Sequence, residues 1–139
     1  AVIHDVGKTT VPAEILSKPG RLSAAEFALI KTHSRVGYDI IKRANLPDPV
    51  AEVVLQHHER LDGSGYPQGL SNDAILPEAQ ILAVADVVEA MSSYRPYRPA
   101  LGIEAALREV SSGSGRLYYP DVVAACLKVF REKGFTFSG

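Results

Sequence analysis

The amino-acid sequence predicts an all-α domain. No stretch alternates apolar and polar residues with the period of two that a half-buried β-strand requires, whereas several stretches repeat apolar residues at helical spacing. With 139 residues, of which 46% are hydrophobic and 22% charged, the chain is long enough for one domain and too short for two. We therefore expect a single helical-bundle domain over residues 1–139, with about six to seven helices.

Charge and cysteine content exclude several functions. The formal net charge of −1 provides no overall basic field for holding a nucleic-acid polymer, so a phosphate-bearing ligand must be met by local cations. Cys126 is the only cysteine, which excludes an internal disulfide and a thiolate metal cage. No signal peptide and no apolar span of about 18 residues is recognisable, so a reducing cytoplasm is the expected compartment.

The first residues have the pattern of a helix end. Residues 1–5 open without an initiator methionine or a capping residue, so we expect a fragment whose preceding helix is missing. Gly7 suits the C-terminus of that helix, and Lys8 lies three residues after Asp5, near enough to share its side of the turn. A short helical turn is expected around residues 12–17.

The next helix begins at a capping box made by Ser23 and Glu26. Its apolar positions recur at helical spacing, so His33 should point inward. The predicted core-facing stripe consists of Ile30, His33, Gly37, Ile40 and Ile41.

A further helix is predicted to end at the pair His57-His58. Asp48 provides its N-cap and Pro49 its first helical position. Apolar valines lie three and four residues before the histidines, so both imidazoles should face the interior. Neighbouring residues on a helix point roughly 100° apart, which disfavours one metal for both rings and favours adjacent metals.

A glycine-punctuated loop separates this helix from a buried one. Gly63, Gly65 and Gly69 allow positive φ and close backbone approach between residues 60 and 76. The helix expected from Pro77 to Met91 is apolar nearly all round, with Asp86 in its middle. A lone buried carboxylate would cost several kcal/mol, so a cation should compensate Asp86.

Two more helices complete the predicted fold. An amphipathic helix is expected over residues 102–110, followed by a loop over residues 111–119. Pro120 suits the first turn of the last helix, and Gly134 suits its end.

The histidines and two aspartates form a candidate metal site. Taken singly, each histidine is more often a hydrogen-bonded core residue than a ligand. Together with Asp5 and Asp86, however, they offer a set of nitrogen and oxygen donors that suits iron, manganese or zinc. Two metal ions bridged by a carboxylate are the usual machinery for in-line attack on phosphorus, and Asp5 is the natural bridge.

Three cations could hold a phosphate ligand. Lys8, Arg95 and Arg98 could equally be solvated surface charges. Prolines flanking the arginine pair favour a held geometry, and guanidinium groups suit a bidentate grip on phosphate oxygens.

An ordered set of motifs covers nearly the whole chain and consists of His4-Asp5-Val6-Gly7-Lys8, His33, His57-His58-Glu59, Asp62-Gly63-Ser64-Gly65-Tyr66-Pro67, Asp86 and Arg95-Pro96-Tyr97-Arg98. This set resembles one protein family, the HD-GYP subgroup of the HD phosphohydrolase superfamily. The resemblance implies a bacterial, all-helical domain that hydrolyses cyclic di-GMP to pGpG or GMP at two or three divalent metal ions, often iron or manganese.

The resemblance also assigns roles to residues and partners. It implies Lys8 at the scissile phosphate and Arg95 and Arg98 on the ligand's phosphates, with Asp5 and Lys8 as catalytic residues. The implied metal ligands are His4, Asp5, His33, His57, His58 and Asp86. The loop from Gly63 to Pro67 is thought to shape the site or to contact diguanylate cyclase domains. An upstream sensor or receiver domain is the further implied partner.

One departure from the family pattern leaves a competing function open. The family takes a further histidine from a helix upstream of its His-Asp pair, and this chain has none, so the first metal is expected to lack a ligand. The alternative is therefore a catalytically impaired module that binds cyclic di-GMP or a cyclase partner. An HD-type mononucleotidase is a third possibility, which the stretch from His57 to Pro67 disfavours.

Self-association as a homodimer through an exposed apolar face is also expected.

Overall fold

The computed structural model describes residues 4–16, 21–47, 49–92 and 102–135, and these residues form helices and loops without a strand. The α-helices are α1 (Ala13–Leu16), α2 (Ala24–Lys31), α3 (His33–Arg43), α4 (Val50–Gln56), α5 (Pro77–Ser92), α6 (Ile103–Ser112) and α7 (Pro120–Arg131), and the 3₁₀ helices are η1 (Val6–Thr10) and η2 (Asn72–Ala74). The prediction of an all-α fold with six to seven helices is confirmed.

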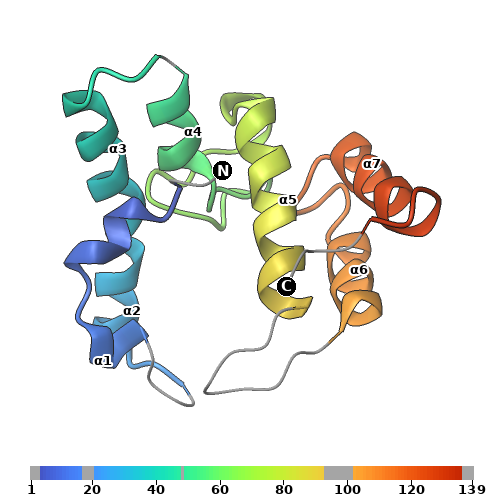
Figure 1. Ribbon diagram of the computed structural model, residues 1–139, viewed down its shortest axis with the longest axis horizontal. Helices are drawn as coiled ribbons and strands as arrows, with labels where there is room; N and C mark the ends of the chain where they lie inside the picture. The colour runs from blue at the N-terminus through green and yellow to red at the C-terminus, as the bar shows by residue number, and fades with distance from the viewer. Residues whose placement is uncertain (1–3, 17–20, 48, 93–101, 136–139) are drawn as a thin grey trace.

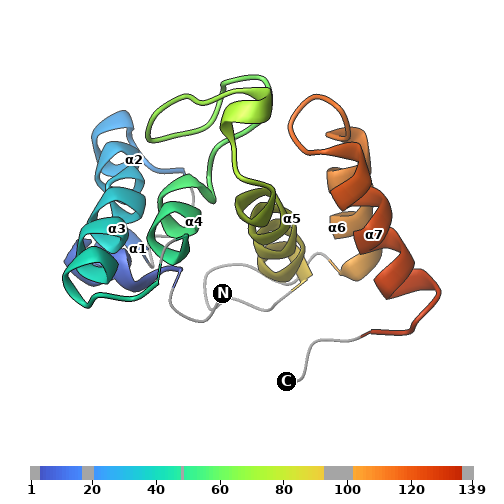
Figure 2. The same cartoon turned by 90° about the horizontal axis from the view of Figure 1, so that it is seen from above.

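Helix α5 is the central element of the molecule. Figures 1 and 2 show α2, α3 and α4 on one side of it and α6 and α7 on the other. On the second side, one apolar core joins the three helices. Its buried members are Val84, Val88, Ala106, Leu107, Val110, Tyr118 and Val123. Asp86 lies on α5 between two of these residues, so the core fixes the helix that carries it.

The first side is built on close backbone contact between η1 and α3. Gly7 packs directly on α3, where an added Cβ would collide with the His33 carbonyl oxygen and lie 2.7 Å from the Gly37 nitrogen. At Gly37, a Cβ would lie 2.9 Å from Val54 of α4. The two glycines therefore let three elements converge, and they bring the residues just before η1 against the start of α3.

A separate apolar cluster packs the loop between α4 and α5. Leu61, Ile75 and Ala79 are buried together. The Tyr119 hydroxyl lies 2.8 Å from the carbonyl oxygens of both Asn72 and Ile75. The glycine-punctuated loop is therefore a packed part of the structure, and Gly63 and Gly69 take positive φ angles of 81° and 66° in it.

Several predicted boundaries are confirmed. Ser23 and Glu26 form the predicted capping box, with both reciprocal hydrogen bonds present. Pro120 lies in the first turn of α7, and Gly134 has a φ of 65° after its end. Helix α6 runs two residues further than expected, to Ser112.

Other local predictions were wrong. The helix expected from Ser23 breaks at Thr32, whose hydroxyl donates to the Leu29 carbonyl and competes with the helical hydrogen bonds. Gly7 lies inside η1, where it serves close packing and not a helix end. Pro49 is the N-cap of α4 and not its first helical residue, and Asp48 lies outside the described residues.

The exposure of two apolar side chains also differs from prediction. Ile40, expected in the core stripe of α3, is 37% exposed. On α5, Ile81 is 57% exposed, so this helix has a solvent-facing side that its composition did not indicate.

In the described part of the chain, no helix combines the length and apolar content needed to cross a membrane.

Candidate metal centre

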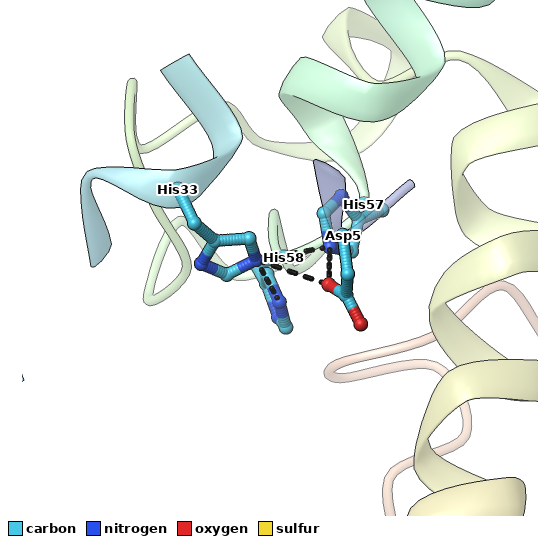
Figure 3. A group of neighbouring side chains, drawn as sticks. All are labelled: Asp5, His33, His57 and His58. Atoms are coloured by element: carbon cyan, nitrogen blue, oxygen red, sulfur yellow. Dashed lines mark hydrogen bonds and ion pairs between the residues drawn. The ribbon is translucent and has the colours of Figure 1, made fainter. Parts of the chain in front are cut away.

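Four side chains from three parts of the chain converge beside α4. Asp5, His33, His57 and His58 each offer one donor atom, and these atoms all lie within 4.8 Å of one another. Figure 3 shows the three rings and the carboxylate pointing toward a common centre. His33 begins α3, Asp5 directly precedes η1, and the two neighbouring histidines follow the last residue of α4. The contact between Gly7 and Gly37 thus positions Asp5 against His33.

Backbone carbonyls fix the orientation of two of the rings. His33 Nδ1 lies 2.6 Å from the Ile30 carbonyl oxygen, and His57 Nδ1 lies 2.6 Å from that of Val54. Because a carbonyl oxygen can only accept, each Nδ1 must carry the proton and donate it. In the neutral form, a ring with its proton on Nδ1 has a lone pair on Nε2, and the Nε2 atoms of His33 and His57 lie 3.4 Å apart. Such a pair lacks a hydrogen to share, so a cation between the rings suits it.

His58 completes the nitrogen set. Its Nε2 lies 3.2 Å from His33 Nε2. Burial, together with the nearby charge of Arg60, lowers the pKa of His58 to about 2. The ring is therefore neutral at physiological pH, as a metal ligand must be.

The two oxygens of Asp5 face different neighbours. Oδ1 is buried without a hydrogen-bond partner among the described residues, 3.4 Å from His33 Nε2 and 3.7 Å from His57 Nε2. Oδ2 lies 3.2 Å from both His4 Nε2 and Lys8 Nζ. Burial by itself would raise the pKa of Asp5, but the contacts of its Oδ2 with His4 and with the Lys8 charge help to hold it well below its usual range. An ionised carboxylate with a buried, unsatisfied oxygen is what a divalent cation would complete.

A second group of donors adjoins the first. His4, His57 and Asp86 also have donor atoms within 4.8 Å of one another. His4 Nε2 lies 3.1 Å from Asp86 Oδ1, and the Asp86 side chain is 23% exposed. Burial raises the pKa of Asp86, but hydrogen bonding to His4 outweighs it, so the net shift is downward. His4 therefore partners Asp86 in the structure, and compensation of Asp86 by a metal cation stays a prediction.

The expected divergence of the His57 and His58 rings is not found, while the metal that each ring serves stays a prediction. Helix α4 ends at Gln56, and both histidines lie in the turn that follows, where the 100° spacing of helical residues no longer applies. Their ring centroids are 4.1 Å apart, and both Nε2 atoms approach that of His33. His57 also belongs to the second group, but its Nδ1 is committed to a carbonyl, so it has one nitrogen to offer.

The predicted phosphate-binding cations are only partly described. Lys8 lies beside the site through its contact with Asp5 and is itself 39% exposed in its side chain. Arg95 and Arg98 lie outside the described residues.

Sequence reasoning quoted Glu59 and Tyr66 within motifs and gave neither a role. Glu59 is fully buried, and its two carboxylate oxygens accept from the backbone nitrogens of Gln68 at 2.7 Å and Leu70 at 2.9 Å. The carboxylate therefore clips the loop to the end of α4, next to the histidines. Its place directly after the histidine pair and before a glycine-rich loop is the signal that could have suggested this role.

Comparison with known families identifies the chain's relatives. The family model described as "HD domain" matches residues 1–122. A cyclic di-GMP phosphodiesterase of Thermotoga maritima is 48% identical over 134 residues, which cover 95% of this chain and 36% of that protein. The cyclic di-GMP phosphodiesterase response regulator RpfG of Xanthomonas campestris pv. campestris is 44% identical, with 92% and 34% covered.

A 3'3'-cGAMP-specific phosphodiesterase of Vibrio cholerae is 40% identical, with 81% of this chain and 27% of that protein covered. The chain thus spans about a third or less of the length of these three relatives.

Solved structures share the fold. An HDG"Y"P protein of Bdellovibrio bacteriovorus matches with a TM-score of 0.73 at 18% identity, covering 92% of this chain and 40% of that one. A cyclic GMP-AMP specific phosphodiesterase of V. cholerae matches with a TM-score of 0.67 at 19% identity, covering 92% and 36%.

Proposed function

Because the chain belongs to the HD-domain family, we propose that it is a metal-dependent phosphodiesterase that hydrolyses cyclic di-GMP. The observation that carries the proposal is the group formed by Asp5, His33, His57 and His58, whose donor atoms all lie within 4.8 Å of one another. The relatives that bear this activity in their names, at 48% and 44% identity, support the substrate.

We assign the donors to two metal ions. The first would be held by His33, His57, His58 and Asp5, and the second by His4, Asp86 and Asp5. This division follows from His57, whose single available nitrogen can serve one ion, and from Asp5, whose two oxygens face the two groups. A donor set of nitrogen and oxygen without sulfur suits iron or manganese.

Bound divalent ions would polarise the phosphodiester and favour a nucleophile derived from water. The chain's own residues supply orientation and charge around that chemistry. Asp5 remains ionised and lies between the two groups, and the carbonyls of Ile30 and Val54 keep two imidazoles in the tautomer that ligation requires. Lys8, next to Asp5, contributes positive charge where negative charge develops on the scissile phosphate. Arg95 and Arg98 are proposed to hold the ligand's phosphates.

The direct test is product analysis by chromatography after incubating the protein with manganese or ferrous ions and either cyclic di-GMP, 3'3'-cGAMP or a mononucleotide. Cleavage of cyclic di-GMP to pGpG or GMP is the expected result. Preferred cleavage of 3'3'-cGAMP would move the protein to the second candidate substrate, which the V. cholerae relative supports. Binding of cyclic di-GMP without turnover would favour the non-catalytic module.

Lys8→Ala separates phosphate chemistry from metal binding. We expect the turnover rate to fall by about a hundredfold or more, since removing one donor aimed at developing charge costs about that much. Metal content, measured by mass spectrometry of the purified variant, should stay unchanged. An unchanged rate with weaker substrate binding would make Lys8 a docking residue only.

A further inference from the structure

The three histidines of the first group are held in different ways. His33 and His57 each donate from Nδ1 to a backbone carbonyl three residues earlier, at 2.6 Å. Among the described residues, no carbonyl or carboxylate accepts from His58 Nδ1. A metal-binding imidazole almost always has such a partner, because the partner fixes the direction in which the ligating nitrogen points. Something else must orient the His58 ring.

The Tyr66 ring packs on the face of the His58 imidazole. It stacks on His58 with ring centroids 4.9 Å apart and planes inclined by only 19°. Stacking over this distance restricts rotation of the imidazole about its side-chain bonds, because turning the ring would collide with the parallel tyrosine. Burial raises the pKa of Tyr66 to about 12, so the ring stays neutral at physiological pH.

The backbone of the loop is built to place Tyr66 there. An added Cβ at Gly65 would collide with the His58 carbonyl oxygen, so glycine permits the loop to lie against this residue. The Tyr66 nitrogen then donates to the same carbonyl at 3.3 Å. The Glu59 carboxylate holds the following residues through Gln68 and Leu70. All of these contacts hold the loop against His58 and Glu59.

Helix α2 supports Tyr66 from a different direction. The Phe27 ring meets it edge to face, with centroids 6.2 Å apart and planes at 82°. Lys31 Nζ lies 5.6 Å from the Tyr66 centroid and 4.8 Å from that of Phe27, within the range of cation–π attraction. Phe27 is 42% exposed, and α2 has no buried residue among those described. Tyr66 is therefore in contact with both α2 and His58.

We infer that Tyr66 is a positioning residue for the metal centre: its ring stacks on His58 and directs His58 Nε2 toward the first group of donors. This inference rests on the proposed function in one respect, that His58 binds a metal ion. It assigns to the tyrosine of the loop a role in metal affinity, through its ring and independently of its hydroxyl.

The test compares cobalt(II) binding by the unaltered protein with that of Tyr66→Leu, Tyr66→Phe and Tyr119→Phe. Leucine keeps apolar bulk without a stacking plane, and phenylalanine keeps the plane without the hydroxyl. Tyr119→Phe is the matched control, because its hydroxyl contacts Asn72 and Ile75 in the same loop without touching a histidine. Competition with a chelator gives the affinity, and the visible absorption of bound cobalt reports the coordination of the ion.

Tyr66→Leu should lose between about tenfold and a hundredfold in cobalt affinity, the usual effect of removing a group that orients a metal ligand, and its absorption spectrum should change. Tyr66→Phe should restore both to the level of the unaltered protein. Tyr119→Phe should lower thermal stability and leave both unchanged.

Three results would overturn the inference. Unaltered affinity and spectrum in a folded Tyr66→Leu protein would show that His58 needs no stack. An equal loss in Tyr66→Phe would assign the role to the hydroxyl, and an equal loss in Tyr119→Phe would reduce it to general loop stability. If the unaltered protein binds no cobalt, the proposed metal centre itself is wrong. The three results above, by contrast, would overturn the role of Tyr66 and leave the metal centre in place.

Discussion

The two groups of donors at the centre differ in how far they satisfy themselves without an ion. In the first group, the Nε2 atoms of His33 and His57 lie 3.4 Å apart while both Nδ1 atoms face carbonyls, and Asp5 Oδ1 has no hydrogen-bond partner among the described residues. In the second, His4 lies 3.1 Å from Asp86, a histidine–carboxylate contact that is favourable without a metal. The first group is therefore preorganised for a cation, whereas the second must give up an existing contact to bind one.

This difference leads us to expect two unequal affinities. A preorganised site loses little free energy on binding, because its donors already converge and its tautomers are set. A site whose ligands pair with each other must break that pair first, which subtracts from the affinity. We expect metal titration of the protein to show a tight step assigned to the first group and a weaker step assigned to the second.

The largest expected effect comes from Asp5→Ala, which removes the residue that contributes to both groups. A four-ligand metal site is worth roughly 10–16 kcal/mol, so one ligand accounts for about 3 kcal/mol, or about a hundredfold in affinity. Both binding steps should weaken by at least about this factor, and turnover should be lost. Isothermal titration calorimetry with manganese measures the two steps, and loss of only one of them would contradict the bridging role.

Asp86→Ala should have a smaller and more selective effect. It removes one member of the second group and leaves the four donors of the first in place. The weaker binding step should disappear while the tight step keeps its affinity, as metal content after dialysis would show. Loss of the tight step instead would mean that the groups do not bind independently.

Much of this centre could be predicted from the sequence. The order and spacing of histidines and aspartates predicted six candidate metal ligands, and the structure brings all six into the two groups. Helical periodicity placed His33 and His57 in the interior because both follow apolar positions on amphipathic helices, and both are buried.

The arrangement of the donors could not be predicted in the same way. Whether His57 and His58 share a site depends on α4 ending at Gln56, and the periodicity does not specify an end to one residue. The partner of Asp86 is His4, which lies 82 positions earlier in the chain. No local sequence pattern indicates that these two residues meet. Glu59 was unassigned because its place before the glycine-rich loop suggests contact with that loop but does not specify which backbone nitrogens will reach its carboxylate.

Glu59→Gln tests whether the loop that Glu59 holds through Gln68 and Leu70 supports the first group in particular. The amide keeps one acceptor, but its NH₂ must face a backbone nitrogen, so one buried N–H is left unsatisfied at a cost of about 1–3 kcal/mol. The free energy of unfolding should fall by about this amount in chemical denaturation. The tight metal step should weaken, since the loop carries Tyr66, while the step assigned to His4 and Asp86 should not. Equal weakening of both steps would remove the distinction between the groups at this position.

The smallest effect is expected from Ser34→Ala, which changes a buried residue next to His33 without changing a donor. Ser34 is fully buried, and its hydroxyl finds no hydrogen-bond partner among the described residues. Removing an unsatisfied hydroxyl relieves its desolvation cost, so the free energy of unfolding should stay unchanged or rise by up to about 1 kcal/mol. Both metal-binding steps should match those of the unaltered protein, which makes this variant the control for core disturbance beside the site. A weakened tight step would indicate that the hydroxyl takes part in holding His33, through a contact such as a bound water, and that the first group depends on more than its donors and their carbonyls.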